Sequence, residues 1–207
     1  MHMARGKFIV LEGGEGSGKS VMMDKLKGVL PQGTVFTRDP GGTSLGEEIR
    51  NLVLGQDARG IDAATELLLF LAARAQVIAE LIAPALEEGK TVISDRFILS
   101  TVAYQVYGRQ KMEYLPLVKS VFNAIKHDCM PDLTILLDVS PEVGLQRVHM
   151  REQAANRFDE EEMAFHQRIR EGYKQHLSDY GKSAVIDANQ PLEEVWTTLL
   201  NAVQSAL

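Results

Sequence analysis

The stretch that decides the fold is FIVLEGGEGSGKS, residues 8–20. Residues 8–12 form an apolar run with β-branched members, which predicts a buried strand. Residues 13–20 match the pattern G-x-x-x-x-G-K-S, and a helical pattern follows them. A strand, a glycine-rich loop and a helix in this order are the context that a phosphate-binding P-loop requires. The sequence therefore predicts that this segment binds ATP or GTP.

Each residue type in the loop has a role toward phosphate. Glycines let the backbone curl so that successive N–H groups face phosphate oxygens, and the dipole of the following helix adds attraction. Lys19 supplies a mobile cation, and the Ser20 hydroxyl can ligate Mg²⁺. We therefore assign nucleotide binding to Gly13, Gly14, Glu15, Gly16, Ser17, Gly18, Lys19 and Ser20.

Short apolar runs alternate with helical patterns along the rest of the chain. The further strand-like runs are residues 35–37, 91–94, 133–137 and 184–186. The longest helical pattern covers residues 62–86, with Asp62 as its cap and Pro84 as a point where it ends or kinks. This alternation predicts an α/β fold, a five-stranded parallel sheet surrounded by helices.

The bulk properties fit a single domain of residues 1–207, with a short lid at about residues 147–160 in a charged stretch. A net charge of −6 does not indicate a basic surface for nucleic acid. Cys129 is the single cysteine, which suits a reducing compartment. The start of the chain shows no signal peptide or membrane-spanning run. We expect a soluble cytoplasmic protein with no nucleic-acid or membrane partner.

Charged residues follow two of the predicted strands. Asp95 and Arg96 come after residues 91–94, and Arg38 follows residues 35–37. Ligands bind at the carboxyl ends of parallel strands, so Asp95 is a candidate for the Mg²⁺ shell and Arg96 for a phosphate. A structural ion pair is the alternative for Asp95 and Arg96, and an exposed turn residue is the alternative for Arg38. Thr43 or Ser44 is expected to cap the next helix.

An arginine interrupts the apolar stripe of the long helix. Phe70 and Arg74 lie four residues apart on the face that also carries Leu67, Leu71 and Val77. A cation on such a face needs a partner. An aromatic ring can stack on a nucleobase while a guanidinium donates to a base carbonyl. Core packing, with the arginine reaching toward solvent, is an equal alternative at this point.

The sequence favours a kinase over a GTP switch. A switch module would show an Asn-Lys-x-Asp run after a strand, and the strand at residues 133–137 instead ends in Asp138-Val139-Ser140-Pro141. A kinase for another small acceptor, or a non-catalytic nucleotide-binding regulator, would also carry a P-loop. The residues that would bind the phosphoryl acceptor must distinguish between these kinds of protein.

Five segments together resemble thymidylate kinase, in the family's order and over most of the chain: residues 12–20, 37–43, 70–74, 95–105 and 131–141. The resemblance implies a P-loop nucleoside monophosphate kinase fold, with ATP as donor and Mg²⁺ as cofactor. It implies transfer of the γ-phosphoryl group to dTMP, giving dTDP and ADP in dTTP biosynthesis. It also implies a homodimer, for which the apolar faces of residues 62–86 and 115–125 are candidates; burial of those faces within the monomer is an equal alternative.

The resemblance also implies roles for individual residues. Phe70 would stack on thymine and Arg74 would hydrogen-bond its carbonyl edge, while Arg38 and Arg96 would hold the acceptor phosphate. The remaining substrate contacts would come from Ser100 and Gln105 in the base and phosphate region, Tyr104 against the sugar, and Glu15 near the 3′-hydroxyl. Ser20 and Asp95 would help to bind the Mg²⁺ ion. Departures from the family pattern are Val21, Asp39 and Phe97, and none removes a group that the chemistry needs.

The lid assignment follows from Gly16. The eukaryotic form of the family has Asp-Arg at this place, whereas this chain has Gly16. The resemblance therefore implies the bacterial type, in which the arginine that stabilises the transition state comes from the lid. Arg147, Arg151 and Arg157 are available, and Arg151 and Arg157 are the preferred pair. The predicted catalytic set is therefore Lys19, Arg96, Arg151 and Arg157. A solvated charge run is the alternative for the lid stretch.

Overall fold

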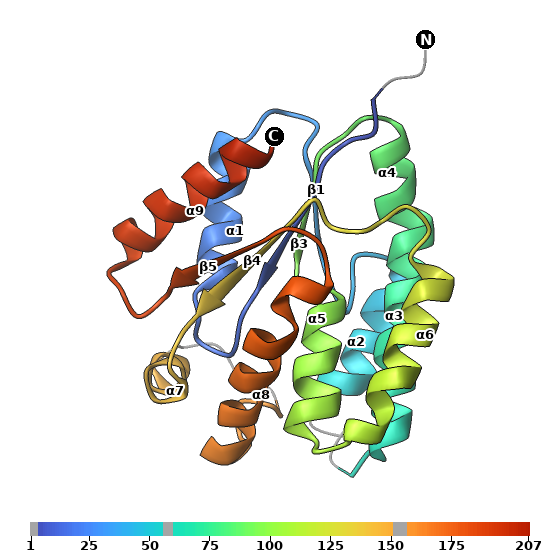
Figure 1. Ribbon diagram of the computed structural model, residues 1–207, viewed down its shortest axis with the longest axis vertical. Helices are drawn as coiled ribbons and strands as arrows, with labels where there is room; N and C mark the ends of the chain where they lie inside the picture. Colours follow the sequence, from blue (N-terminus) through green and yellow to red (C-terminus); the bar gives the residue numbers. More distant parts are fainter. Residues whose placement is uncertain (1–3, 56–59, 151–156) are drawn as a thin grey trace.

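The computed structural model describes residues 4–55, 60–150 and 157–207. In this part of the chain the sheet has five strands: β1 (Phe8–Glu12), β2 (Val35–Arg38), β3 (Val92–Asp95), β4 (Leu133–Asp138) and β5 (Ser183–Asp187). They pair in parallel in the order β2-β3-β1-β4-β5. Helices cover both faces (Figure 1). The predicted α/β fold with a five-stranded parallel sheet is confirmed, and each strand lies within a residue or two of its predicted run.

β1 is central and buried along its whole length, which explains its apolar sequence. Successive side chains of a strand point to opposite faces of the sheet. Phe8 and Val10 accordingly enter the core on one face, and Ile9 and Leu11 enter the core on the other. The strand that leads into the glycine-rich loop is thereby held from both sides.

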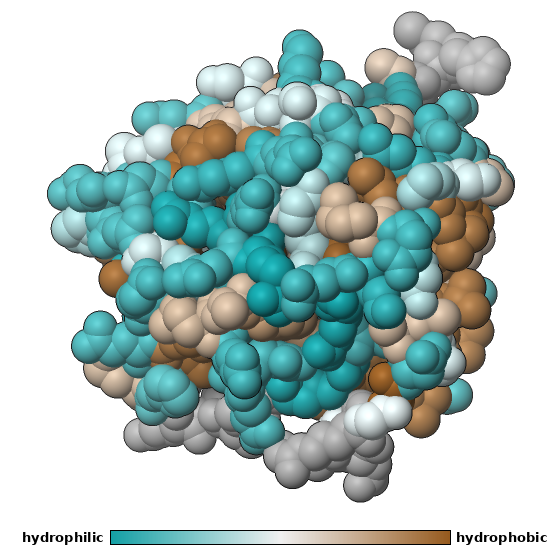
Figure 2. All heavy atoms as spheres, turned by 60° about the horizontal axis from the view of Figure 1, so that its bottom comes forward, coloured by the Kyte–Doolittle hydropathy of each residue, from teal (hydrophilic) through white to brown (hydrophobic). Residues whose placement is uncertain are grey.

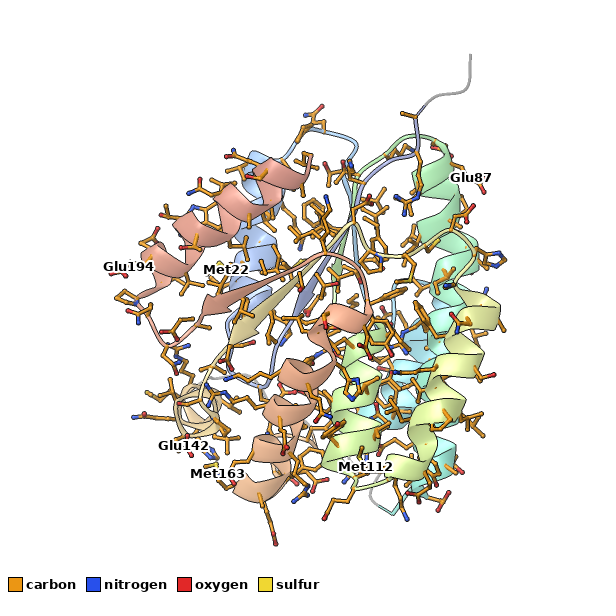
Figure 3. The ribbon with its side chains drawn as sticks, in the orientation of Figure 1. Met22, Glu87, Met112, Glu142, Met163 and Glu194 are labelled. Carbon is orange, nitrogen blue, oxygen red and sulfur yellow. The ribbon has the colours of Figure 1, made fainter. Side chains whose placement is uncertain are left out.

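Two helices cover one face of the sheet. They are α1 (Lys19–Val29) and α9 (Leu192–Ala206), which lie on the left of Figure 1. Met22, labelled on α1 in Figure 3, is 1% exposed and joins Leu26, Leu199 and Ile135 in this core. The packing fixes α1, and with it the end of the glycine-rich loop, against the sheet.

The other face carries the larger layer of helices. Its members are α2 (Ser44–Leu54), α3 (Ala63–Val77), α4 (Ala83–Glu87), α5 (Ile98–Thr101), α6 (Leu115–Ile125) and α8 (Met163–His176). Short π- and 3-10-helical turns link them: η2 (Ile78–Ile82), η3 (Val102–Gly108), η4 (Met112–Tyr114) and η5 (Leu177–Asp179). Phe97, Phe122 and Tyr173 belong to the core of this layer.

The long helix was predicted correctly at both ends. The Asp62 carboxylate accepts hydrogen bonds from the backbone N–H groups of Ala64 and Thr65, and the helix ends at Glu87. Pro84 does not end it, because the hydrogen-bond pattern widens to the π-helix η2 immediately before the proline.

An 18-residue window within the run Ala63–Glu87 has a mean hydropathy of 1.7, so the run is long and apolar enough to cross a membrane by length and composition alone. A core helix passes the same test. Here the run buries Leu67, Val77 and Ile82 in the core of the domain, together with the charged residues Glu66 and Arg74. These contacts account for its apolar character.

Two further elements lie near the carboxyl ends of the strands. Thr43 caps α2 by accepting from the N–H of Gly46, as one of the two predicted caps. α7 (Pro141–His149) follows β4. Glu142 near the start of α7 and Met163 at the start of α8, both labelled in Figure 3, lie at the lower end of the molecule, toward which β1 runs. The loops after β1, β2, β3 and β4 therefore meet at one end of the sheet.

Candidate active site

A cleft with a volume of about 1040 Å³ opens at this end of the sheet. Figure 2 brings that end forward and shows mostly hydrophilic residues across it. The predicted site residues that line the cleft are Glu15, Gly16, Ser17, Gly18, Lys19, Ser20, Arg38, Phe70, Arg74, Asp95, Arg96, Ser100, Tyr104 and Gln105. These residues come from four separate parts of the chain and share one space.

The glycine-rich loop curls as its sequence predicts. Gly16 and Gly18 have positive φ angles of 68° and 89°, in the left-handed region that glycine adopts readily. A Cβ atom on Gly16 would lie 2.0 Å from the carbonyl oxygen of Gly144, so the loop approaches α7 too closely for any side chain there. Gly18 forms the N-cap of α1, whose first N–H groups face the cleft without a capping side chain.

Lys19 lies at the first position of α1 with its ammonium inside the loop. It donates to the carbonyl oxygens of Gly13 and Gly14, at 2.8 and 3.2 Å, and to the Ser17 hydroxyl at 3.2 Å. Burial and the nearby charge of Arg96 lower the pKa of Lys19 to about 8. The loop therefore concentrates positive charge and N–H dipoles where a phosphate chain fits.

Arg96 lies at the centre of a hydrogen-bond network at the end of β3. Its guanidinium donates to the Gly13 carbonyl oxygen at 2.9 Å, to the Glu15 carboxylate at 3.0 Å and to the Tyr104 hydroxyl at 3.0 Å. The Tyr173 hydroxyl and the Ser100 hydroxyl accept from it as well, at 2.8 and 3.2 Å. Tyr104 in turn donates to Glu15 at 2.8 Å. An arginine fixed by this many acceptors is held in one position before any ligand arrives.

The backbone at Arg96 is strained, and buried groups hold it. Its φ angle is 71°, which is unusual for a residue other than glycine. Its N–H donates to the Leu11 carbonyl oxygen, and its own carbonyl oxygen accepts from the Ser94 hydroxyl at 2.7 Å. Glu12, fully buried, accepts from the N–H groups of Phe97 and Ser100. These bonds bind the turn after β3 to the end of β1.

Arg74 has the partner that its place on an apolar face demands. Its Nε donates to Asp39 at 2.6 Å, and both side chains are 1% exposed. Nη1 donates to the Thr101 hydroxyl at 2.6 Å and Nη2 to the Phe97 carbonyl oxygen at 3.1 Å. The alternative in which Arg74 reaches solvent is therefore wrong, and Arg74 is a buried residue in the lining of the cleft.

Aromatic rings line the cleft beside Arg74. Phe70 is 7% exposed and lies 6.4 Å from the ring of Phe158, which packs edge-on against Tyr104 at 5.4 Å. Gln105 is 2% exposed and donates to the buried carboxylate of Glu66 at 3.0 Å. Such a wall can hold a flat ring, with polar groups at its edge.

Arg38 and Asp95 stand at neighbouring strand ends. Arg38 is paired with Glu47 at 2.6 Å, and its side chain is half exposed. Asp95 Oδ1 is buried and makes no hydrogen bond within the part of the chain that the structure describes. Asp95 and Ser20 both line the cleft, and carboxylate and hydroxyl oxygens are ligands that Mg²⁺ accepts.

The predicted lid arginines have different outcomes. Arg151 lies outside the described residues. Arg157 donates to Glu66 at 2.6 Å and to the Val53 carbonyl oxygen, and its guanidinium lies over the Phe158 ring. The described lining of the cleft does not include it. Arg147 does line the cleft, where it donates to the Ala188 carbonyl oxygen at 2.8 Å and weakly to that of Gly16.

Sequence reasoning missed several residues that shape the site. Glu12, Glu66 and Tyr173 are buried polar groups whose partners lie far away in the chain. A carboxylate at the end of an apolar strand and another on the apolar face of a helix were the available signals for Glu12 and Glu66. The sequence pattern does not indicate Tyr173 as a site residue, because a tyrosine in an amphipathic helix is typical of the hydrophobic core.

Comparisons with known proteins agree with this geometry. The model of the family described as thymidylate kinase matches residues 11–199. A thymidylate kinase of Clostridium novyi is 42% identical over 94% of this chain and 96% of its own length. One from a Marinomonas species is 45% identical over 92% of this chain and 91% of its own length.

A solved structure gives the same answer. The crystal structure of thymidylate kinase from Ehrlichia chaffeensis superposes with a TM-score of 0.73 at 32% identity, and it covers 97% of this chain and 99% of that one. On sequence, fold and the residues gathered in the cleft, this chain belongs to the thymidylate kinase family.

Proposed function

We propose that this member of the thymidylate kinase family transfers the γ-phosphoryl group of ATP to dTMP, giving dTDP and ADP in dTTP biosynthesis. The observation that carries the proposal is a single cleft in which the P-loop and the acceptor-reading residues meet. A nucleotide-binding regulator would need the P-loop alone. Here Phe70, Arg74 and Arg96 complete a second subsite within the same space.

At the donor end, the P-loop of residues 13–20 binds the phosphates of ATP. Its backbone N–H groups and the start of α1 attract the phosphate oxygens, and Lys19 exchanges its carbonyl partners for them. Ser20 and Asp95 hold Mg²⁺, an assignment supported by the unpartnered oxygen of Asp95. Among the described residues no group of three or more His, Cys, Asp and Glu side chains could hold a metal.

At the acceptor end, Arg96 and Arg38 bind the phosphate of dTMP. Arg96 is already aligned, and Arg38 leaves Glu47 to join it. Phe70 stacks on thymine and Arg74 donates to its carbonyl edge, for which two of its five N–H groups remain. The other contacts are Ser100, Gln105, Tyr104 against the sugar, and Glu15 near the 3′-hydroxyl.

Catalysis in this scheme is alignment and charge compensation. The attacking oxygen of dTMP is ionised at neutral pH, so no general base is needed. Lys19 and Arg96 both donate to the Gly13 carbonyl oxygen and so bring two positive charges close together in the cleft, where the transferred group passes. Mg²⁺, when bound, neutralises phosphate charge and orients the transferred group. We propose Arg151 and Arg157 as the lid arginines, in a lid of about residues 147–160 on a single domain of residues 1–207. Arg157 must leave Glu66 to take this role.

We also propose a homodimer. Leu68 on α3 and Leu117 on α6 are large apolar residues with 55% and 44% of their surface exposed. Figure 2 shows hydrophobic atoms along the right margin of the molecule, the side on which Figure 1 draws α6 and α3. A second copy of the chain would bury these residues across a two-fold axis. The cytoplasm is the proposed location, in keeping with the buried free thiol of Cys129.

A coupled ADP-release assay tests the reaction. ATP and Mg²⁺ are supplied with dTMP, dUMP, dCMP or dGMP, and with no acceptor as the control. Turnover that requires dTMP supports the proposal, and it should disappear in Lys19→Ala, which removes the P-loop cation. ADP release at the same rate without any acceptor would assign the chain to the ATPases or regulators instead.

A further inference from the structure

We propose that Tyr173, on α8, is a positioning residue that aligns Arg96 for the acceptor phosphate. The inference rests on the proposed function, because it takes Arg96 as the phosphate-binding arginine. Tyr173 is 1% exposed, so it reaches solvent and substrate only through its neighbours. α8 begins at Met163, labelled in Figure 3, and packs against α5 and η3, which follow Arg96 in the chain.

The contacts form an unbroken chain of hydrogen bonds. Arg96 Nη1 lies 2.8 Å from the Tyr173 hydroxyl, which lies 2.8 Å from the Ser100 hydroxyl. The Ser100 hydroxyl lies 2.6 Å from Glu12 Oε2. A buried carboxylate on the central strand is thereby linked to the acceptor arginine through two hydroxyl groups.

Burial raises the pKa of Glu12, and the Ser100 hydrogen bond and the Arg96 charge act against that shift. With the carboxylate ionised, each hydrogen bond in this chain has one direction. Each contact of Glu12 is with a donor, since the N–H groups of Phe97 and Ser100 reach its other oxygen, so the ionised carboxylate fits the site. Ser100 has one proton and donates it to Glu12, so Tyr173 must donate to Ser100. The Tyr173 oxygen is then left to accept from Arg96. Charge at both ends strengthens the bonds between them.

Tyr173 is one of five hydrogen-bond partners of the Arg96 guanidinium, and it acts on Nη1. The backbone φ of Arg96, 71°, is strained, and an arginine side chain has high rotamer freedom. Binding a phosphate is tighter when the guanidinium is already in place, because the cost of ordering it is met on folding. Glu15 and Tyr104 hold Nη2, whereas Nη1 depends on Tyr173, Ser100 and the Gly13 carbonyl oxygen.

The test removes one hydroxyl and keeps the ring. Tyr173→Phe preserves the edge-on packing against Tyr104 at 6.3 Å and deletes both bonds of the hydroxyl. Tyr107→Phe is the matched control: Tyr107 is buried between η3 and α8, and its hydroxyl bonds His176 at 3.0 Å, away from the cleft. Calorimetry measures the dissociation constants of dTMP and of thymidine, which lacks the phosphate.

We expect Tyr173→Phe to weaken dTMP binding about tenfold, in line with the loss of one hydrogen bond to a charged group. In Tyr173→Phe, the dissociation constant of thymidine and the KM for ATP should stay within about twofold of wild type, because neither depends on the contact of Arg96 with the acceptor phosphate. Tyr107→Phe should change none of the three constants, because its hydroxyl does not contact Arg96. Equal weakening of dTMP and thymidine, or no weakening of dTMP, would overturn the inference.

A double-variant cycle separates positioning from general loosening. Ser100→Ala breaks the same chain, so the loss of dTMP affinity in Tyr173→Phe with Ser100→Ala should be well below the product of the two single losses. Independent losses that multiply would count against a shared chain. A wild-type protein that binds dTMP no better than thymidine would overturn the proposed function itself, which distinguishes that failure from failure of the Tyr173 assignment.

Discussion

Arg74 carries a full positive charge inside the protein, and Asp39 is the partner that makes this tolerable. Both side chains are 1% exposed. Removing one member of a buried ion pair leaves the other charge without compensation. We expect Arg74→Ala to lower the free energy of unfolding by about 3–5 kcal/mol, measured by urea denaturation.

The exposed pair of Arg38 and Glu47 provides the comparison. Their side chains are 52% and 38% exposed. Solvent screens such a pair, so Arg38→Ala should cost no more than about 1 kcal/mol. Equal free energies of unfolding for Arg74→Ala and Arg38→Ala would contradict the prediction that the buried ion pair contributes more to stability than the exposed pair. An activity assay on Arg74→Ala should therefore be read only beside its stability.

Lys19 gives a prediction about proton uptake. Its pKa of about 8 comes from burial and from Arg96, so a substantial fraction of the free protein carries a neutral amine at pH 8. Phosphate oxygens favour the charged form and raise the pKa. ATP binding at pH 8 should take up protons and at pH 6.5 should take up few through this group, measured by calorimetry in buffers of different ionisation enthalpy. Lys19→Arg, which stays charged, should abolish the uptake at pH 8.

At the scale of elements, Glu66 joins parts of the chain that no single helix could hold. From α3 it accepts hydrogen bonds from Gln105 on η3, from Arg109, and from Arg157 beyond α7. Its side chain is 1% exposed. Glu66→Gln should lower the free energy of unfolding by about 3 kcal/mol at pH 7, because Arg109 and Arg157 lose a buried counter-charge.

The cost of Glu66→Gln should depend on pH. Burial acts to raise the pKa of Glu66, but hydrogen bonds from Arg109 and Gln105 and the arginine charges outweigh it, so the pKa lies below its ordinary value of 4.5. The stabilisation is therefore complete above about pH 4.5 and is lost as the pH falls through the folded pKa. The gap between variant and wild type should close in acid. Glu161→Gln, which removes a partly exposed partner of Arg109, should show no comparable gap.

Elements were predicted well where their signals are local. The strand-loop-helix order at residues 8–20, the Asp62 cap and the Thr43 cap depend on neighbours a few residues away. The effect of Pro84 could not be predicted. The helix continues past it through a π-helical turn, and a proline in the sequence does not indicate whether a helix ends or widens in this way. The sequence predicts that Arg74 needs a partner on its apolar helix face. It does not identify Asp39 as that partner, because 35 residues separate the two.

At the scale of the whole molecule, the exposed apolar side chains make a prediction about assembly. Leu68→Glu with Leu117→Glu should shift the protein from dimer to monomer in sedimentation velocity at micromolar concentration, because a buried interface does not accept unpaired charges. Leu192→Glu changes a residue on α9 that is 47% exposed, and it should leave the sedimentation coefficient unchanged. A wild-type monomer at all concentrations would contradict the proposed dimer.

The site as a whole shows where sequence reasoning ends. Strand ends can be predicted to meet at one edge, and Arg38, Asp95 and Arg96 do line a common cleft. The chain of contacts from Glu12 to Tyr173 could not be predicted, because it depends on which face of α8 packs against η3. Such contacts follow from three-dimensional packing, and no local pattern encodes them.

The place of β1 in the sheet has a consequence for protein synthesis. β1 is synthesised before both of its sheet neighbours, which begin to pair with it only at Val92 and Leu133. Tyr173, which bonds Arg96, comes later still. A nascent chain therefore exposes its apolar P-loop strand until most of the protein has been made, and chaperone binding to a stalled chain should decline only once β4 has emerged.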